Sequence, residues 1–69
     1  MSIYRQIFNL LNKTVVSSRV IFAIIGLLDD YSCNPIHDKI FDLLFEFLES
    51  QNNAVLENVR KICIGNLEN

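Results

Sequence analysis

Residues 36–49 constrain the fold more than any other segment of this 69-residue chain. At 100° per residue, their apolar side chains fill an arc of about 200°, whereas packing against one neighbouring layer needs only about 100°. Asn34 and Pro35 come just before them and favour a helix start, because asparagine caps helices and proline fits the first helical position. We therefore expect a helix with two apolar sides.

The two apolar sides of this helix have different expected roles. The positions expected to face the core are Ile36, Ile40, Leu43, Leu44 and Phe47. A second stripe consists of Phe41, Phe45 and Leu48. Exposed apolar patches usually mark interaction sites, so this stripe is predicted to be the interface with a second copy or another partner. The alternative is that the N-terminal helix covers the stripe within one chain.

The remaining face of the same helix is acidic. Lys39 lies at its edge, and residues 29–49 carry a net charge of −5 against +3 for residues 1–28. The acidic strip is either a solvated face or a docking surface for a basic partner, whose approach such charges would steer. Charge segregation also favours antiparallel self-association or neutralisation within the chain. The strip is formed by Asp38, Asp42, Glu46 and Glu49.

Three further helices are expected, at residues 3–13, 16–30 and 54–67. Ser2 is the expected cap of the first and Asn53 of the last, and Phe22 falls on the side of the second that should face water. Two glycines, one proline and no polar–apolar alternation argue against a β protein. The predicted class is all-α: one domain, residues 1–69, forming a small bundle of three to four helices. Because burial and chain ordering nearly cancel at this size, we expect a homodimer with a helical interface.

The inventory of reactive side chains argues against an enzyme and against a metal or cofactor. His37 is the only histidine, and the chain has no nucleophile elbow or phosphate loop, so His37 is expected to be structural or exposed. Cys33, His37 and Cys63 lack the spacing of a four-ligand zinc site. Cys63 is expected in the core, and Cys33 is the more plausible exposed thiol, with any redox role left open.

Nucleic acid and membrane are both disfavoured as partners. The candidate DNA contacts are separated in sequence and the net charge is −2, so DNA binding is the less favoured hypothesis. The longest apolar run, residues 20–28, is far shorter than the roughly 20 residues needed to span a bilayer, and no targeting signal is visible. A cytoplasmic protein is expected. The candidate DNA contacts are Arg5, Lys13, Arg19, Arg60 and Lys61.

The second half of the chain carries a recognisable layout. It has the pattern (Ile/Leu)-x3-Leu-(Leu/Ile/Phe)-x2-Leu-Glu at residues 40–49, a polar turn at 50–53, and Val-Arg-Lys-Ile at 59–62. With the apolar helix before it, the segment from about residue 20 to 67 resembles the YmgB/AriR family of biofilm and acid-resistance regulators, also called two-component-system connector proteins.

The resemblance implies a non-enzymatic, all-helical, dimeric bacterial protein that feeds into a phosphorelay. Its partners would be itself and a sensor kinase or response regulator, and it would act in biofilm formation, acid resistance or stress signalling. DNA binding has also been attributed to this family. Two alternatives stay open: a direct DNA-binding transcriptional regulator, and a helical scaffold or interaction module.

Overall fold

The computed structural model describes residues 2–13, 15–30 and 34–68, and within them it contains helices and no strands. The all-α class predicted from the sequence is therefore confirmed. The helices are α1 (Ile3–Lys13), α2 (Ser18–Asp29), α3 (Pro35–Ser50) and α4 (Asn53–Ile64).

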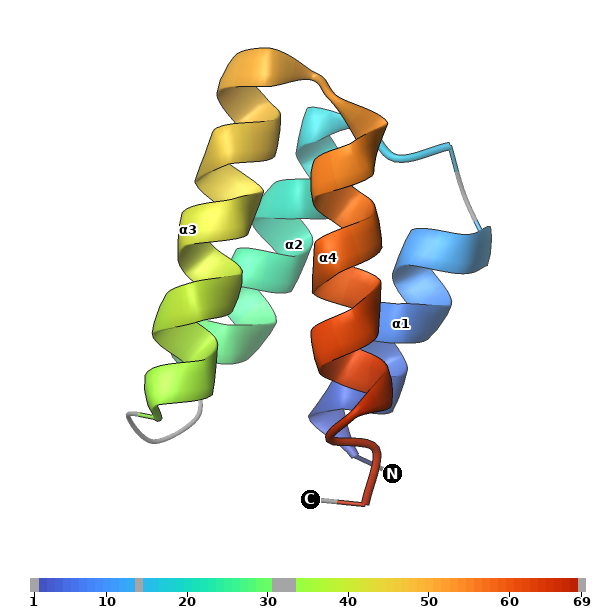
Figure 1. Ribbon diagram of the computed structural model, residues 1–69, viewed down its shortest axis with the longest axis vertical. Helices are drawn as coiled ribbons and strands as arrows, with labels where there is room; N and C mark the ends of the chain where they lie inside the picture. Colours follow the sequence, from blue (N-terminus) through green and yellow to red (C-terminus); the bar gives the residue numbers. More distant parts are fainter. Residues whose placement is uncertain (1, 14, 31–33, 69) are drawn as a thin grey trace.

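The helices form a ring in which successive helices run in opposite directions. In Figure 1, α1 and α3 run upward while α2 and α4 run downward. Each helix packs against two neighbours: α3 against α4 and α2, and α1 against the same two. Short connections favour this up-and-down topology. Because α1 and α3 lie diagonally across the ring, α1 does not cover the outer side of α3.

Polar side chains define where the helices begin. The Asn34 side-chain oxygen accepts a hydrogen bond from the Ile36 N–H at 2.9 Å, which confirms the prediction that Asn34, followed by Pro35, caps this helix. The Ser2 hydroxyl likewise accepts from the Tyr4 N–H at 3.1 Å. In each case the cap satisfies a backbone donor that the helix itself cannot.

The fourth helix begins one residue earlier than the expected cap implies. Asn52 caps it by accepting from the Ala54 N–H at 3.0 Å, and Asn53 is the first helical residue, so the prediction of Asn53 as cap was wrong. The preceding residue, Gln51, adopts a left-handed conformation with φ of 55° and ends α3. Asn52, which follows Gln51, has the extended backbone conformation that a capping residue needs.

The core runs along the centre of the ring and draws on every helix. Each helix contributes buried residues three or four positions apart, which is the period of one helical face. His37 is the one polar residue among the described residues that is buried with them. The buried apolar residues are Ile3, Tyr4, Ile7, Leu11, Ile21, Ile24, Leu28, Ile40, Leu44, Phe47, Val55, Leu56, Val59 and Cys63.

Candidate functional site

The stripe predicted on α3 is open to solvent in the single chain. Phe45 is 51% exposed, and Phe41 and Leu48 are half-buried against the edge of the core. The N-terminal helix does not cover them, because α1 packs on α4 and α2. The stripe is thus an apolar surface that its own chain leaves uncovered.

Helical geometry decides which neighbour of α3 the stripe lies beside. Phe41, Phe45 and Leu48 each directly follow a buried residue, and one residue is a turn of about 100° around the helix. Arg60 and Asn12 also each follow a buried residue, and the Arg60 Nε donates to the Asn12 Oδ1 at 3.1 Å, so these flanks of α4 and α1 meet. Because neighbouring helices run in opposite directions, the flank formed by residues that directly follow a buried residue meets the same kind of flank on one neighbour only. This flank of α1 meets that of α4, so the corresponding flank of α3 meets that of α2. The stripe therefore lies on the α2 side of α3.

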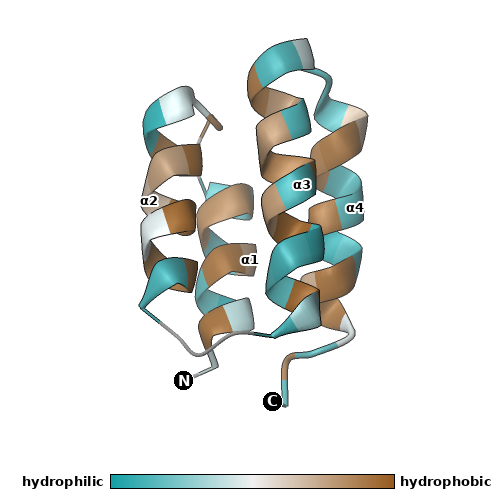
Figure 2. Cartoon of the chain, turned by 90° about the vertical axis from the view of Figure 1, so that its left-hand side faces the viewer, coloured by the Kyte–Doolittle hydropathy of each residue, from teal (hydrophilic) through white to brown (hydrophobic). Residues whose placement is uncertain are grey.

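Helix α2 extends this surface with side chains that the interface prediction did not include. Phe22 and Ile25 each directly follow a buried isoleucine, so they occupy the corresponding flank of α2. Phe22 is 59% exposed, and Ile25 is half-buried. Helices α2 and α3 are in contact, and Figure 2, in which α1 is visible between them, shows hydrophobic segments on both ribbons. We call this surface the α2–α3 face; it consists of Phe22, Ile25, Phe41, Phe45 and Leu48.

Carboxylates lie on α3 beside the α2–α3 face and at the end of α2. Two follow one another at the end of α2 and the others form the acidic strip along α3, and all are exposed. Among the described residues, the one ion pair joins Arg60 and Glu57 on α4, so none of these carboxylates is paired with a cation. The two nearest cations in sequence are Arg19 and Lys39. The rim acids are Asp29, Asp30, Asp38, Asp42, Glu46 and Glu49.

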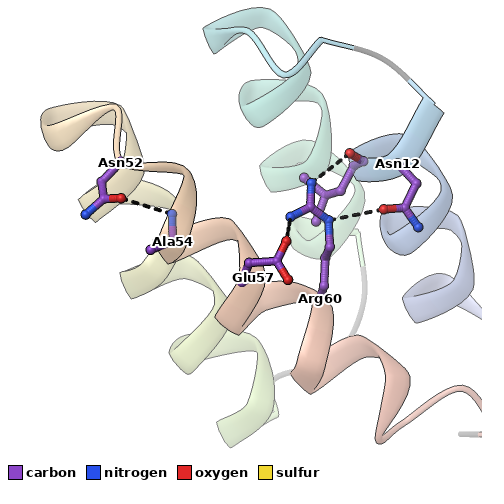
Figure 3. Close-up of polar contacts among 6 residues, drawn as sticks. Asn12, Asn52, Ala54, Glu57 and Arg60 are labelled. Carbon is purple, nitrogen blue, oxygen red and sulfur yellow. Dashed lines mark hydrogen bonds and ion pairs between the residues drawn. The ribbon is translucent and has the colours of Figure 1, made fainter.

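Arg60, one of the five candidate DNA contacts, is engaged within its own chain. Its guanidinium donates to the Leu11 carbonyl at 3.1 Å, bonds Asn12 and pairs with Glu57 (Figure 3). Cations near a helix C-terminus stabilise its unpaired carbonyls. Arg60 therefore ties α4 to the end of α1, which the spacing of charges in the sequence did not indicate.

The other four candidate DNA contacts are exposed but spread over three helices. Arg5 lies in the first turn of α1, and Lys13 is the last residue of that helix, about 12 Å further along its axis. Arg19 is in the first turn of α2, and Lys61 is in the last turn of α4. The structure therefore brings no two of them together on one helical turn.

The single histidine is part of the core. The Tyr4 hydroxyl and the His37 Nε2 are 2.8 Å apart, and the two rings meet edge to face with centroids 5.7 Å apart. Burial raises the pKa of the Tyr4 hydroxyl, and Cys63 nearby raises it further. This pair joins the diagonal helices α1 and α3. Of the two expectations for His37, structural or exposed, the exposed one is wrong, because the side chain is buried.

The sequence predicts different environments for the two cysteines, Cys63 in the core and Cys33 exposed. Cys63 is fully buried, as expected, and burial raises the pKa of its thiol to about 11. The expectation of an exposed thiol at Cys33 lies outside the described residues. No group of three or more side chains that could hold a metal ion occurs in the part of the chain that is described.

Comparison with protein-family models, curated proteins and solved structures gives no match. None of the helices in the described ranges is long and apolar enough to cross a membrane. The fold itself defines the class as a small up-and-down four-helix protein. Its candidate functional site is the α2–α3 face with its acidic rim.

Proposed function

We propose that this chain is a small non-enzymatic regulatory protein that acts by protein–protein contact through the α2–α3 face. The observation that carries the proposal is the exposure of Phe22 and Phe45 on two helices that pack against each other. Two phenylalanines that are more than half exposed lower the solubility of a small protein unless a binding partner covers them. Aromatic side chains, phenylalanine among them, are also enriched in protein–protein interfaces.

The biological setting follows from the sequence resemblance described above. A connector of the two-component type would act in biofilm, acid-resistance or stress signalling by binding a sensor kinase or response regulator in the cytoplasm. A direct DNA-binding role has less support, because Arg60 is engaged by α1 and the rim acids carry the opposite charge to a DNA-binding surface.

Site-specific photo-crosslinking tests whether the face contacts a protein. A photoreactive phenylalanine analogue replaces Phe45 in the cells that naturally make the protein, and a matched chain carries it at Ile64, which is 54% exposed on α4. We expect protein adducts from position 45 and none from position 64. Absence of adducts from position 45, or equal adducts from both positions, would refute the proposal.

The sequence predicts a second copy as one occupant of the face. In that case Phe45→Asp converts a dimer into an unstable monomer, because it places a charge inside the apolar contact. Sedimentation equilibrium and thermal melting of the wild type and this variant check the prediction. An unchanged sedimentation profile and melting curve would exclude a homodimer through this stripe.

A further inference from the structure

We propose that the α2–α3 face binds a basic amphipathic helix of a partner protein. The inference rests on the proposed contact function and adds the chemistry of the occupant. Its basis is the combination of an uncovered apolar surface and a rim of unpaired carboxylates.

The apolar part of the face has the dimensions of two helical turns. From Phe41 to Leu48 the α3 backbone rises about 10 Å, which matches the spacing of anchors at i, i+3 or i+4, and i+7 on an incoming helix. Phe22 on α2 and Phe45 on α3 are more than half exposed, whereas Ile25, Phe41 and Leu48 are half-buried. A helix that lies between the two phenylalanines buries both of them.

The rim decides the charge of the occupant. Six exposed carboxylates line α3 and the end of α2, and among the described residues none has a cationic partner. Within residues 18–50 the cations are Arg19 and Lys39. Complementary charges at an interface rim speed association and exclude wrong partners. An occupant with lysine or arginine beside its apolar stripe therefore fits, whereas an anionic membrane or nucleic acid does not.

A second copy of this chain is a poorer occupant of the same face. A two-fold contact places the same patch on both sides, so it brings two sets of six carboxylates together around one interface. Only Arg19 and Lys39 of each copy oppose that repulsion. Like-charge juxtaposition disfavours such a contact.

Binding of two designed peptides tests the inference. Both are fluorescently labelled 18-residue helices with leucine at positions i, i+3, i+4 and i+7, which form one apolar stripe. The first peptide carries lysine beside this stripe, and the second carries glutamate there. In fluorescence anisotropy at low salt, we expect the lysine peptide to bind the full chain at least tenfold more tightly, about 1.4 kcal/mol. We expect the difference to shrink as salt screens the rim.

Two variants separate the contributions of the apolar surface and the rim. The double variant Phe22→Asp, Phe45→Asp is expected to lose binding of the lysine peptide, although it adds two negative charges. The variant Asp38→Asn, Asp42→Asn, Glu49→Gln removes three of the six rim charges and is expected to narrow the difference between the two peptides. Ile64→Asp is the matched control and is expected to bind like the wild type. All substituted side chains are exposed, and circular dichroism verifies that each variant is folded.

Three results would overturn the inference. Equal binding of the two peptides removes the role of the rim, and stronger binding of the lysine peptide to the double variant shows that only general charge attraction is at work. Self-association of the wild type that Phe45→Asp abolishes, without peptide binding, assigns the face to a second copy. That last result leaves the proposed contact function standing, whereas absence of crosslinks from position 45 removes the contact function itself.

Discussion

Replacing Tyr4 with phenylalanine removes one buried hydrogen bond and little else. Tyr4 is 4% exposed and His37 is 7% exposed, and the tyrosine hydroxyl is 2.8 Å from the His37 Nε2. The substitution keeps the packing of the ring but leaves a buried imidazole nitrogen without its partner. An unsatisfied buried polar group costs about 1–3 kcal/mol, so we expect Tyr4→Phe to lower the free energy of unfolding by that amount.

A double-mutant cycle separates this hydrogen bond from changes in packing. His37→Leu leaves the Tyr4 hydroxyl unsatisfied in the same way, whereas the double variant removes both polar groups and is expected to cost less than the sum of the single changes. The coupling energy is expected between about 0.5 and 3 kcal/mol. Urea unfolding followed by circular dichroism measures it.

The thermal midpoint provides a second measurement of the same effect. In a domain of this size, 1 kcal/mol corresponds to about 4–8 °C, so a loss of about 2 kcal/mol lowers the midpoint by about 8–16 °C. If Tyr4→Phe changes the free energy of unfolding by less than about 0.3 kcal/mol, or if the two substitutions are additive, the bond does not stabilise the fold.

Two further predictions concern a helix cap and a buried thiol. Asn52→Ala is expected to destabilise the protein by about 1 kcal/mol because it removes the cap of α4, whereas Asn53→Ala is expected to cost much less; equal effects in urea unfolding would contradict this cap assignment. Because burial raises the pKa of Cys63 to about 11, the folded thiol keeps its proton while the unfolded thiol loses it above pH 9. Stability from this group is therefore complete below pH 9 and falls as the pH rises to about 11, by about 1.4 kcal/mol per unit of pKa shift. Unfolding free energies measured from pH 8 to 11 should fall less steeply in Cys63→Ala, and parallel slopes would refute the assignment.

Local signals in the sequence predict the helices and most of their ends. Residues 3–13 form α1 as expected, and Asn34 with Pro35 starts α3, because caps and helical periodicity act within a few residues. The second helix begins at Ser18, two residues later than predicted, and the fourth ends at Ile64, three residues earlier. At both places apolar residues continue the helical pattern past the end of the helix.

The candidate site is predicted only in part for a related reason. The sequence indicates the stripe of Phe41, Phe45 and Leu48 and the acidic strip, since both are properties of one helix. It also places Phe22 on the water-facing side of its helix. It does not indicate that Phe22 lies beside the stripe, because that depends on which flanks of α2 and α3 meet in the folded bundle.

Helical periodicity and capping residues in the sequence predict a helical protein, the positions of its main breaks, and more apolar surface on α3 than one contact can cover. Which part of that surface is covered depends on how the helices pack against one another. The order of helices around the ring carries α1 to α4 and α2, pairs Arg60 with the end of α1, and joins Tyr4 to His37 across the core. The contacts of Tyr4 with His37 and of Arg60 with Leu11 link residues 33 and 49 positions apart, and helical periodicity contains no information about contacts over such separations. The same packing leaves Phe22 and Phe45 exposed together on the α2–α3 face.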